Sequence, residues 1–155
     1  MLPIDLPISV EVVPLTEVPE AEEVFEDSPD PERRRPVVLI VDDERLIADT
    51  LSAIFAKCGF AALTAYDAPS ALEVAKFCAP EILISDVALP GMNGVDLAIA
   101  LKEVAPACKV LLFSAHAGAA ELVMAAREMG HEFLFLAKPV HPAIVVTRAK
   151  ELVAA

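Results

Sequence analysis

The sequence is poor in basic residues, poor in cysteine and without a long apolar run, and each shortage excludes a class of protein. Twelve Lys and Arg stand against 24 Asp and Glu, for a formal net charge of −12 over 155 residues. This balance argues against sequence-independent nucleic-acid binding, which depends on clustered basic residues. The three cysteines form neither a CxxC redox pair nor a zinc knuckle, and we interpret them as reduced, buried thiols.

No stretch of the sequence is apolar for long enough to span a bilayer. The longest charge-free run in the patterned part of the chain lies between Lys109 and Glu121, whereas a spanning helix needs about 20 apolar residues. The first ten residues, MLPIDLPISV, contain an aspartate, two prolines and no basic residue, so they do not form a secretory signal. We therefore expect a soluble, cytoplasmic protein.

The composition changes sharply near Pro36. Seven of the 13 prolines fall at or before this residue, and residues 1–35 carry ten acidic and three basic residues, for a net charge of −7. Dense prolines block helix and sheet hydrogen bonds, and like charges extend a chain. We predict a mostly disordered arm at 1–35, in which the alternating segment 8–13 is able to pair with a sheet edge, and one folded domain at 36–155. The arginines at 33–35 are interpreted as a solvated cap before the first strand.

From Pro36 onward, short apolar or β-branched runs alternate with longer stretches of helical period. The runs at 37–41 and 82–85 have no polar face, which is typical of strands buried on both sides of a parallel sheet. Glycines at 59 and 130 and a proline at 106 mark helix ends. Five strand–helix units in series predict an open α/β sandwich, with helices on both faces of a parallel sheet.

The pattern also predicts where each element lies. The expected strands are 37–41, 60–66, 82–85, 110–113 and 133–137. The expected helices are 44–58, 69–78, 94–105, 118–129 and 141–153. Four phenylalanines are expected in the core: Phe55, Phe60, Phe77 and Phe113.

Polar residues with useful chemistry follow four of the five expected strands. They are Asp42 and Asp43, Asp86, Ser114 and Lys138. Ligands of open parallel sheets bind beyond the carboxyl ends of the strands, so we expect these side chains at one rim. Three carboxylates there repel one another unless a cation shares them, and Mg²⁺ suits such oxygen ligands. A carboxylate nucleophile, a divalent cation, a lysine and a hydroxyl are the groups needed for phosphoryl transfer to an aspartate.

This set of residues resembles that of the response-regulator receiver domain of two-component signalling. The matching segments are VDDE at 41–44, DVALPGMNG at 86–94, SA at 114–115 and KP at 138–139. Each segment is weak alone, but together, each at its own strand end, they are specific. The resemblance covers about residues 36–152 and implies a flavodoxin-like, doubly wound five-stranded sheet of order 2-1-3-4-5.

The resemblance implies a role for individual residues. Asp86 would be the phosphoacceptor, and Ser114 and Lys138 would contact its phosphoryl group. The Mg²⁺ ligands are Asp43 directly, Asp42 through water, Asp86, and the backbone carbonyl of Ala88. The switch residues are Ser114 and Phe135. Pro90 and Gly94 fit the sharp loop after the third strand, where glycine allows a positive φ.

The resemblance further implies a phosphoacceptor that catalyses only its own phosphorylation and dephosphorylation. A sensor histidine kinase or a histidine phosphotransfer protein would supply the phosphoryl group. Phosphorylation would change partner binding at the face formed by residues 118–129, 133–137 and 141–153. A phosphorylation-dependent homodimer is compatible with that face. The sequence to Ala155 contains no segment that resembles an output domain, so we expect signalling by contact, onward relay of phosphate in a phosphorelay, or a fragment of a longer regulator.

Three other interpretations remain open at this stage. A Mg²⁺-dependent phosphatase with an aspartate nucleophile would carry Asp-x-Asp after the first strand, where this chain has adjacent aspartates. A flavin mononucleotide binder would need hydroxyls and amides around the phosphate, which Asp42 and Asp43 would repel. A receiver-like module that binds partners without phosphorylation would not need the full residue set.

Overall fold

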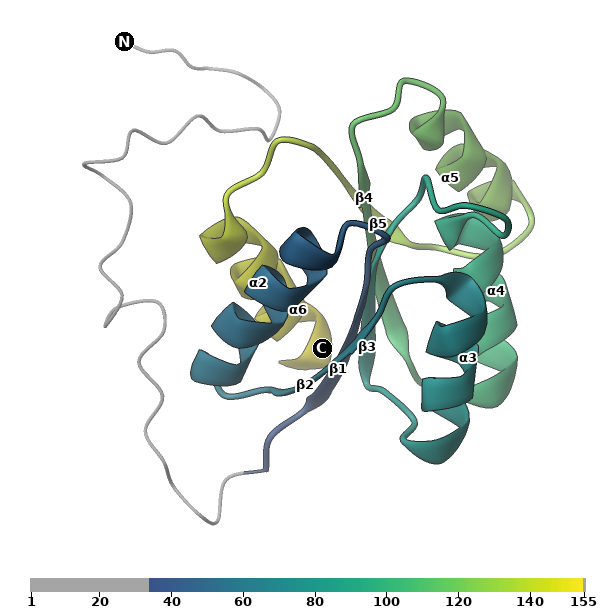
Figure 1. Cartoon of the computed structure of the whole chain (residues 1–155). Helices are drawn as coiled ribbons and strands as arrows, with labels where there is room; N and C mark the ends of the chain where they lie inside the picture. Colours follow the sequence, from purple (N-terminus) through teal and green to yellow (C-terminus); the bar gives the residue numbers. More distant parts are fainter. Residues whose placement is uncertain (1–33, 155) are drawn as a thin grey trace, which may run out of the picture.

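The chain folds as a parallel sheet between two layers of helices (Figure 1). The computed structural model describes residues 34–154, so the predictions for residues 1–33 lie outside the described residues. The strands are β1 (Val37–Val41), β2 (Ala61–Ala65), β3 (Ile82–Asp86), β4 (Lys109–Ser114) and β5 (Leu134–Ala137). The helices are α2 (Arg45–Lys57), α3 (Ala68–Phe77), α4 (Gly94–Val104), α5 (Ala119–Glu128) and α6 (Pro142–Ala154).

The strand order is β2-β1-β3-β4-β5, and all four neighbouring pairs are parallel. The predicted fold class is therefore confirmed. Helices α2 and α6 cover one face of the sheet, and α3, α4 and α5 cover the other (Figure 1). No described helix is both long and apolar enough to cross a membrane.

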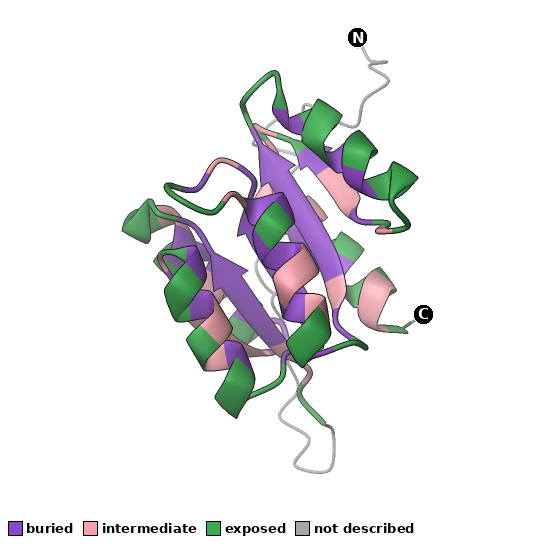
Figure 2. Cartoon of the chain, turned by 90° about the vertical axis from the view of Figure 1, so that its right-hand side faces the viewer, coloured by how far each residue is buried: buried purple, intermediate pink, exposed green. Residues whose placement is uncertain are grey.

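Two apolar layers hold the helices to the sheet. All five residues of β3 are buried, as are four of the five in β1, and the central strands appear buried along their length in Figure 2. Alternate residues face opposite layers, so Leu39 and Leu83 pack toward α3 and α4 while Ile40 and Ile84 pack toward α2 and α6. The continuous apolar runs in the sequence thus correspond to strands covered on both sides.

Short polar contacts define where the helices begin and end. The Asp67 side chain accepts a hydrogen bond from the Ser70 N–H (2.8 Å), and Asn93 accepts one from the Asp96 N–H (2.9 Å), which caps α3 and α4. Gly59, with a φ of 97°, follows α2, as its predicted role as a helix stop requires.

Arg34 and Arg35 anchor the start of the domain. Arg34 forms an ion pair with Glu81. The Arg35 guanidinium donates to the carbonyls of Ala56 (2.6 Å) and Phe60 (3.2 Å). Both arginines are exposed. Arg35 holds the start of the domain against the C-terminal end of α2.

The core prediction is wrong at the end of α3. Phe55, Phe60 and Phe113 are buried, but Phe77 is 87% exposed and the neighbouring Cys78 is exposed too. The buried positions of α3 are Ala68, Ala71 and Ala75. At about 100° per residue, position 77 lies some 200° around the helix from position 75 and therefore faces solvent. Apolar character alone did not reveal that orientation.

The loop that follows Asp86 depends on Gly94, although not for the predicted reason. The residue with positive φ in this loop is Gly91 (79°), whereas Gly94 is not among the residues with positive φ. A Cβ on Gly94 would lie 2.2 Å from the carbonyl oxygen of Asp86 and 2.9 Å from the Cα of Val87. The Gly94 N–H also donates to the Val87 carbonyl at 2.8 Å. Glycine is needed here because two backbone segments touch.

We expect Gly94→Ala to lower the free energy of unfolding by about 1–3 kcal/mol, because the methyl group forces backbone atoms apart. Gly118→Ala is the matched control, since no atom lies within 4 Å of its Cβ position and its φ of −80° suits alanine. Urea denaturation of both variants measures the difference. Equal stability of the two variants would contradict the role assigned to the close approach.

Candidate functional site

Four strands deliver polar side chains to the carboxyl edge of the sheet. Asp42 directly follows β1, Asp86 ends β3, Ser114 ends β4 and Lys138 directly follows β5. The register pairs Val41 with Ser85, Asp86 with Phe113 and Ser114 with Ala137, which sets the ends of these strands side by side. The strand ends therefore bring together residues that are up to 96 positions apart in the sequence.

Three carboxylates meet in this pocket. Asp42, Asp43 and Asp86 each offer an oxygen atom, and these atoms all lie within 4.8 Å of one another. Asp42 is fully buried and Asp86 is 8% exposed, whereas Asp43 is exposed. Two of the three carboxylates are thus buried, and the third is accessible to solvent.

Asp42 is the most constrained member of the cluster. Its Oδ1 accepts a hydrogen bond from the Glu44 N–H at 2.9 Å. Its Oδ2 is buried and receives no hydrogen bond from the described residues; the Lys138 ammonium lies 3.5 Å away. Burial raises the pKa of Asp42, while the Glu44 N–H and the Lys138 charge oppose that effect. The neighbouring N–H and ammonium groups therefore do not fully compensate the ionised Asp42 carboxylate for the loss of its hydration.

Lys138 supplies the one ammonium that touches this cluster among the described residues. Its Nζ lies 3.4 Å from Asp86 Oδ2 and 3.5 Å from Asp42 Oδ2. It also lies 4.6 Å from the centroid of the Phe113 ring, within cation–π range. The Lys138 N–H donates to the Ser114 carbonyl at 3.0 Å, which ties the base of the side chain to β4.

Sequence analysis did not assign Phe113 to this site. It was expected in the core, and it is buried, but its ring also lies beneath the Lys138 ammonium. The one available signal was its position directly before Ser114, at the end of a strand. That position does not reveal which side chain from the neighbouring strand will lie over the ring.

The pocket fits a divalent cation by charge and by ligand type. With its carboxylates ionised, three negative charges face one ammonium, which leaves two negative charges uncompensated. The ligand atoms are all oxygens, as hard divalent cations prefer. The buried Asp42 Oδ2 receives no hydrogen bond from the described residues and faces the Lys138 ammonium at 3.5 Å, so a cation would add the positive charge that it lacks.

The remaining predicted site residues border the pocket. The Ala88 N–H donates to Asp86 Oδ1 at 3.1 Å and so orients the carboxylate. Ser114 is buried, and its Oγ accepts from the His116 N–H at 3.1 Å. Phe135 lies on β5, half-buried and packed against the apolar layer of α4 and α5. The structure thus places both predicted switch residues on adjacent strands.

Fold and site together define an open α/β domain with an acidic pocket at the carboxyl edge of its sheet. Residues 38–150 match the family model of the response regulator receiver domain. The chain belongs to this family, in which phosphorylation and Mg²⁺ binding are general features and histidine kinases or phosphotransfer proteins are the interacting partners.

Known proteins agree with this assignment. The probable transcriptional regulatory protein TcrX of Mycobacterium tuberculosis is 31% identical over 115 residues, covering 74% of this chain and 48% of that protein. The Regulator of RpoS of Escherichia coli is 33% identical over 116 residues, covering 75% and 33%. The chain therefore spans between a third and a half of the length of these relatives.

Solved structures agree on the fold. A receiver domain protein (CheY-like) from Methanospirillum hungatei JF-1 superposes with a TM-score of 0.70 at 23% identity, covering 78% of this chain and 95% of that one. A putative response regulator from Chloroflexus aurantiacus J-10-fl gives a TM-score of 0.68 at 28% identity, covering 79% and 100%.

Replacing the buried charge tests the electrostatics of the pocket. Because its folded-state pKa is raised, Asp42 destabilises the fold as the pH rises from about 4, the unfolded value, through the folded pKa. We expect Asp42→Asn to be more stable than the wild type at pH 7 without Mg²⁺, by about 1–3 kcal/mol. The difference should shrink toward pH 4.

Urea denaturation at pH 5 and pH 7, with and without Mg²⁺, measures both effects. Mg²⁺ should stabilise the wild type and not the variant. Glu103→Gln, at an exposed position of α4, serves as the control and should behave as the wild type. A variant that is less stable than the wild type at pH 7 without Mg²⁺ would contradict the unbalanced charge of Asp42.

Proposed function

We propose that the protein is a phosphoacceptor switch that receives a phosphoryl group on Asp86. The observation that carries this proposal is the position of Asp86 among three charged neighbours. Its Oδ2 lies 3.4 Å from the Lys138 ammonium, and its carboxylate shares a cluster with Asp42 and Asp43. This arrangement combines a nucleophile, a fixed positive charge and a site for a divalent cation.

The transfer step follows from these contacts. A carboxylate oxygen of Asp86 forms a bond to phosphorus while the phosphorus–nitrogen bond of a donor phosphohistidine breaks, and the electron pair of that bond returns to the imidazole nitrogen. The Ala88 N–H holds Oδ1 in place. Lys138 lies where it can contact the phosphoryl oxygens. The product is an acyl phosphate on Asp86, and its hydrolysis by water returns the free carboxylate and releases inorganic phosphate.

The metal would be Mg²⁺, held by Asp43, Asp86 and the Ala88 carbonyl, with Asp42 acting through water. When bound, it neutralises charge on the transferring phosphoryl group. The buried Oδ2 of Asp42, which receives no hydrogen bond from the described residues, supports this assignment.

The signal would leave the pocket through Ser114 and Phe135. Ser114 Oγ accepts one hydrogen bond from His116 and keeps its own proton to donate to a phosphoryl oxygen. A shift of Ser114 toward Asp86 would open space that Phe135 fills. This rearrangement would shift the equilibrium between two conformations of the face formed by α5, β5 and α6.

That face offers apolar side chains to a partner. Leu122 and Met124 of α5 are 42% and 56% exposed, whereas Val123 of α5 is buried and belongs to the core. In α6, Val145 and Val146 are buried as well. We therefore assign partner contacts on this face to α5. The phosphoryl donor would be a sensor histidine kinase or a histidine phosphotransfer protein. The protein would catalyse only its own phosphorylation and dephosphorylation.

Replacing the acceptor tests the proposal. We expect Asp86→Asn to abolish phosphoryl labelling by acetyl phosphate in the presence of Mg²⁺, because an amide oxygen is a poor nucleophile. Intact-mass spectrometry measures the added phosphoryl group. Asp96→Asn, at an exposed carboxylate of α4, is the matched control and should be labelled as the wild type is. Retained labelling of Asp86→Asn would refute the acceptor assignment.

A further inference from the structure

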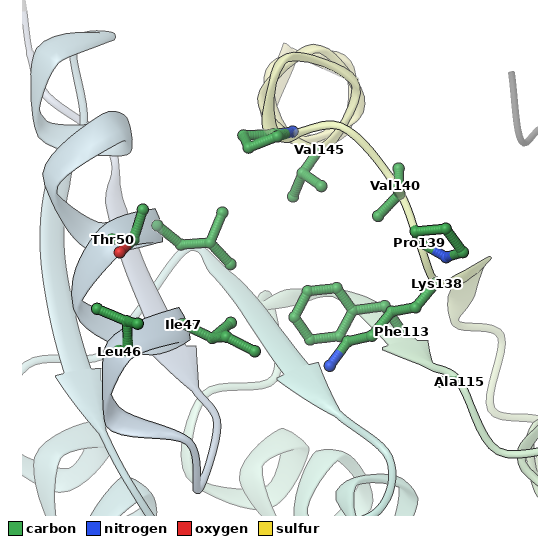
Figure 3. A pocket seen from close by; sticks show the side chains of 11 residues that line it. Leu46, Ile47, Thr50, Phe113, Ala115, Lys138, Pro139, Val140 and Val145 are labelled. Atoms are coloured by element: carbon green, nitrogen blue, oxygen red, sulfur yellow. The ribbon is translucent and has the colours of Figure 1, made fainter. Parts of the chain in front are cut away.

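An apolar groove lies beside the candidate site, on the side of the sheet covered by α2 and α6. Its volume is about 570 Å³, within the range of sites that accept a ligand or several side chains. Figure 3 shows one wall from α2, with Leu46 and Ile47, and the other from the segment between β5 and α6, with Pro139 and Val140. Lys138 is the one charged residue of the lining.

The groove is separate from the acidic pocket but adjoins it. None of the three clustered aspartates lines it, whereas Lys138 and Phe113 belong to both. Leu46 is 78% exposed at the rim. A contiguous exposed apolar surface is typical of a place where another segment, a partner or a ligand binds.

The chain itself contains a segment of matching chemistry outside the described residues. Residues 1–15 hold eight aliphatic side chains and only two acidic ones, Asp5 and Glu11, whereas residues 16–33 hold eight acidic residues and one arginine. The apolar and acidic parts are thus separate in sequence. Within the first part, apolar residues alternate with polar ones as Ile8, Ser9, Val10, Glu11 and Val12, so an extended backbone presents three aliphatic side chains on one side.

The point at which the chain enters the domain places this segment within reach of the groove. The Arg35 contacts to Ala56 and Phe60 hold the entering chain at the C-terminal end of α2, the helix that forms one wall of the groove. From Ala56 back to Leu46 is ten helical residues, or about 15 Å. Eighteen residues span at most about 59–65 Å when fully extended, several times this distance. Residues 16–33 are therefore long enough to bring residues 8–12 to the groove.

A connector that reaches the site makes the contact intramolecular, so the effective concentration of the segment at the groove depends on the connector and not on the protein concentration. A weak apolar contact is then occupied more often than the same contact between separate molecules. A free partner or a second copy of the chain has no comparable advantage at ordinary protein concentrations. Charged side chains are disfavoured in an apolar groove. The eight acidic residues of 16–33 therefore suit the connector and not the inserted segment.

We propose that the groove between α2 and the β5–α6 segment is a docking site for the chain's own N-terminal segment, with Ile8, Val10 and Val12 as the inserted side chains. The docked segment covers Pro139 and Val140 next to Lys138. Any protein that approaches the site across this face must displace it. The inference concerns the unphosphorylated chain, and its test does not depend on the proposed function.

Paramagnetic relaxation in the full chain tests the docking. A nitroxide is attached at Ser9→Cys in a Cys78→Ser background, because Cys78 is exposed while the other two cysteines are buried. We expect the amide signals of Leu46, Ile47 and Val140 to lose intensity, and those around Phe77 at the end of α3 to keep it. A mixture of spin-labelled, unenriched chains with ¹⁵N-labelled chains without the nitroxide should show no such loss, since the contact is intramolecular.

Variants on each side of the contact complete the test. Ile8→Asp with Val10→Asp should restore the groove signals, and so should Leu46→Glu, which alters an exposed side chain. Met124→Glu, also at an exposed apolar position, is the matched control and should leave the loss unchanged. Loss centred on the exposed edge of β2, loss in the mixed sample, uniform or absent loss, or loss that survives Ile8→Asp with Val10→Asp would each overturn the proposal.

Discussion

The structure depends on one electrostatic constraint, the burial of the Asp42 carboxylate at the end of a strand that is covered on both faces. β1 cannot expose a polar side chain along its length, so its first carboxylate appears where the strand ends. There Asp42 lies beside Asp86 and Asp43, with Lys138 as the neighbouring cation. One ammonium cannot balance three carboxylates, and we expect the same imbalance to weaken the metal-free fold and to favour binding of a divalent cation.

The sequence predicts the fold well because its strongest signals are those that a parallel sheet imposes. Continuous apolar runs at β1 and β3, and helix stops at Gly59 and Gly130, correspond to elements within one or two residues of the observed bounds. The candidate site was predictable because the carboxyl ends of parallel strands meet at one edge. Strand order came from the family resemblance and not from the apolar pattern.

Features that depend on contact between distant segments were not predictable. Gly94 is required by the approach of the Asp86 carbonyl, and no sequence signal distinguishes that need from a turn with positive φ. The contact of the Phe113 ring with Lys138 depends on the register of β4 and β5. Phe77 was misassigned because hydrophobicity does not report which side of α3 a residue occupies. These contacts also give Lys138 two environments, the acidic pocket and the apolar groove.

The most direct test of the account is a crystal structure of the protein with Mn²⁺ and beryllofluoride, with Mn²⁺ located by its anomalous scattering. The account predicts a single Mn²⁺ among Asp42, Asp43 and Asp86, a beryllofluoride group on the Asp86 carboxylate, and the Lys138 ammonium against a fluorine atom. A pocket without Mn²⁺, or a beryllofluoride group bound elsewhere, would contradict it.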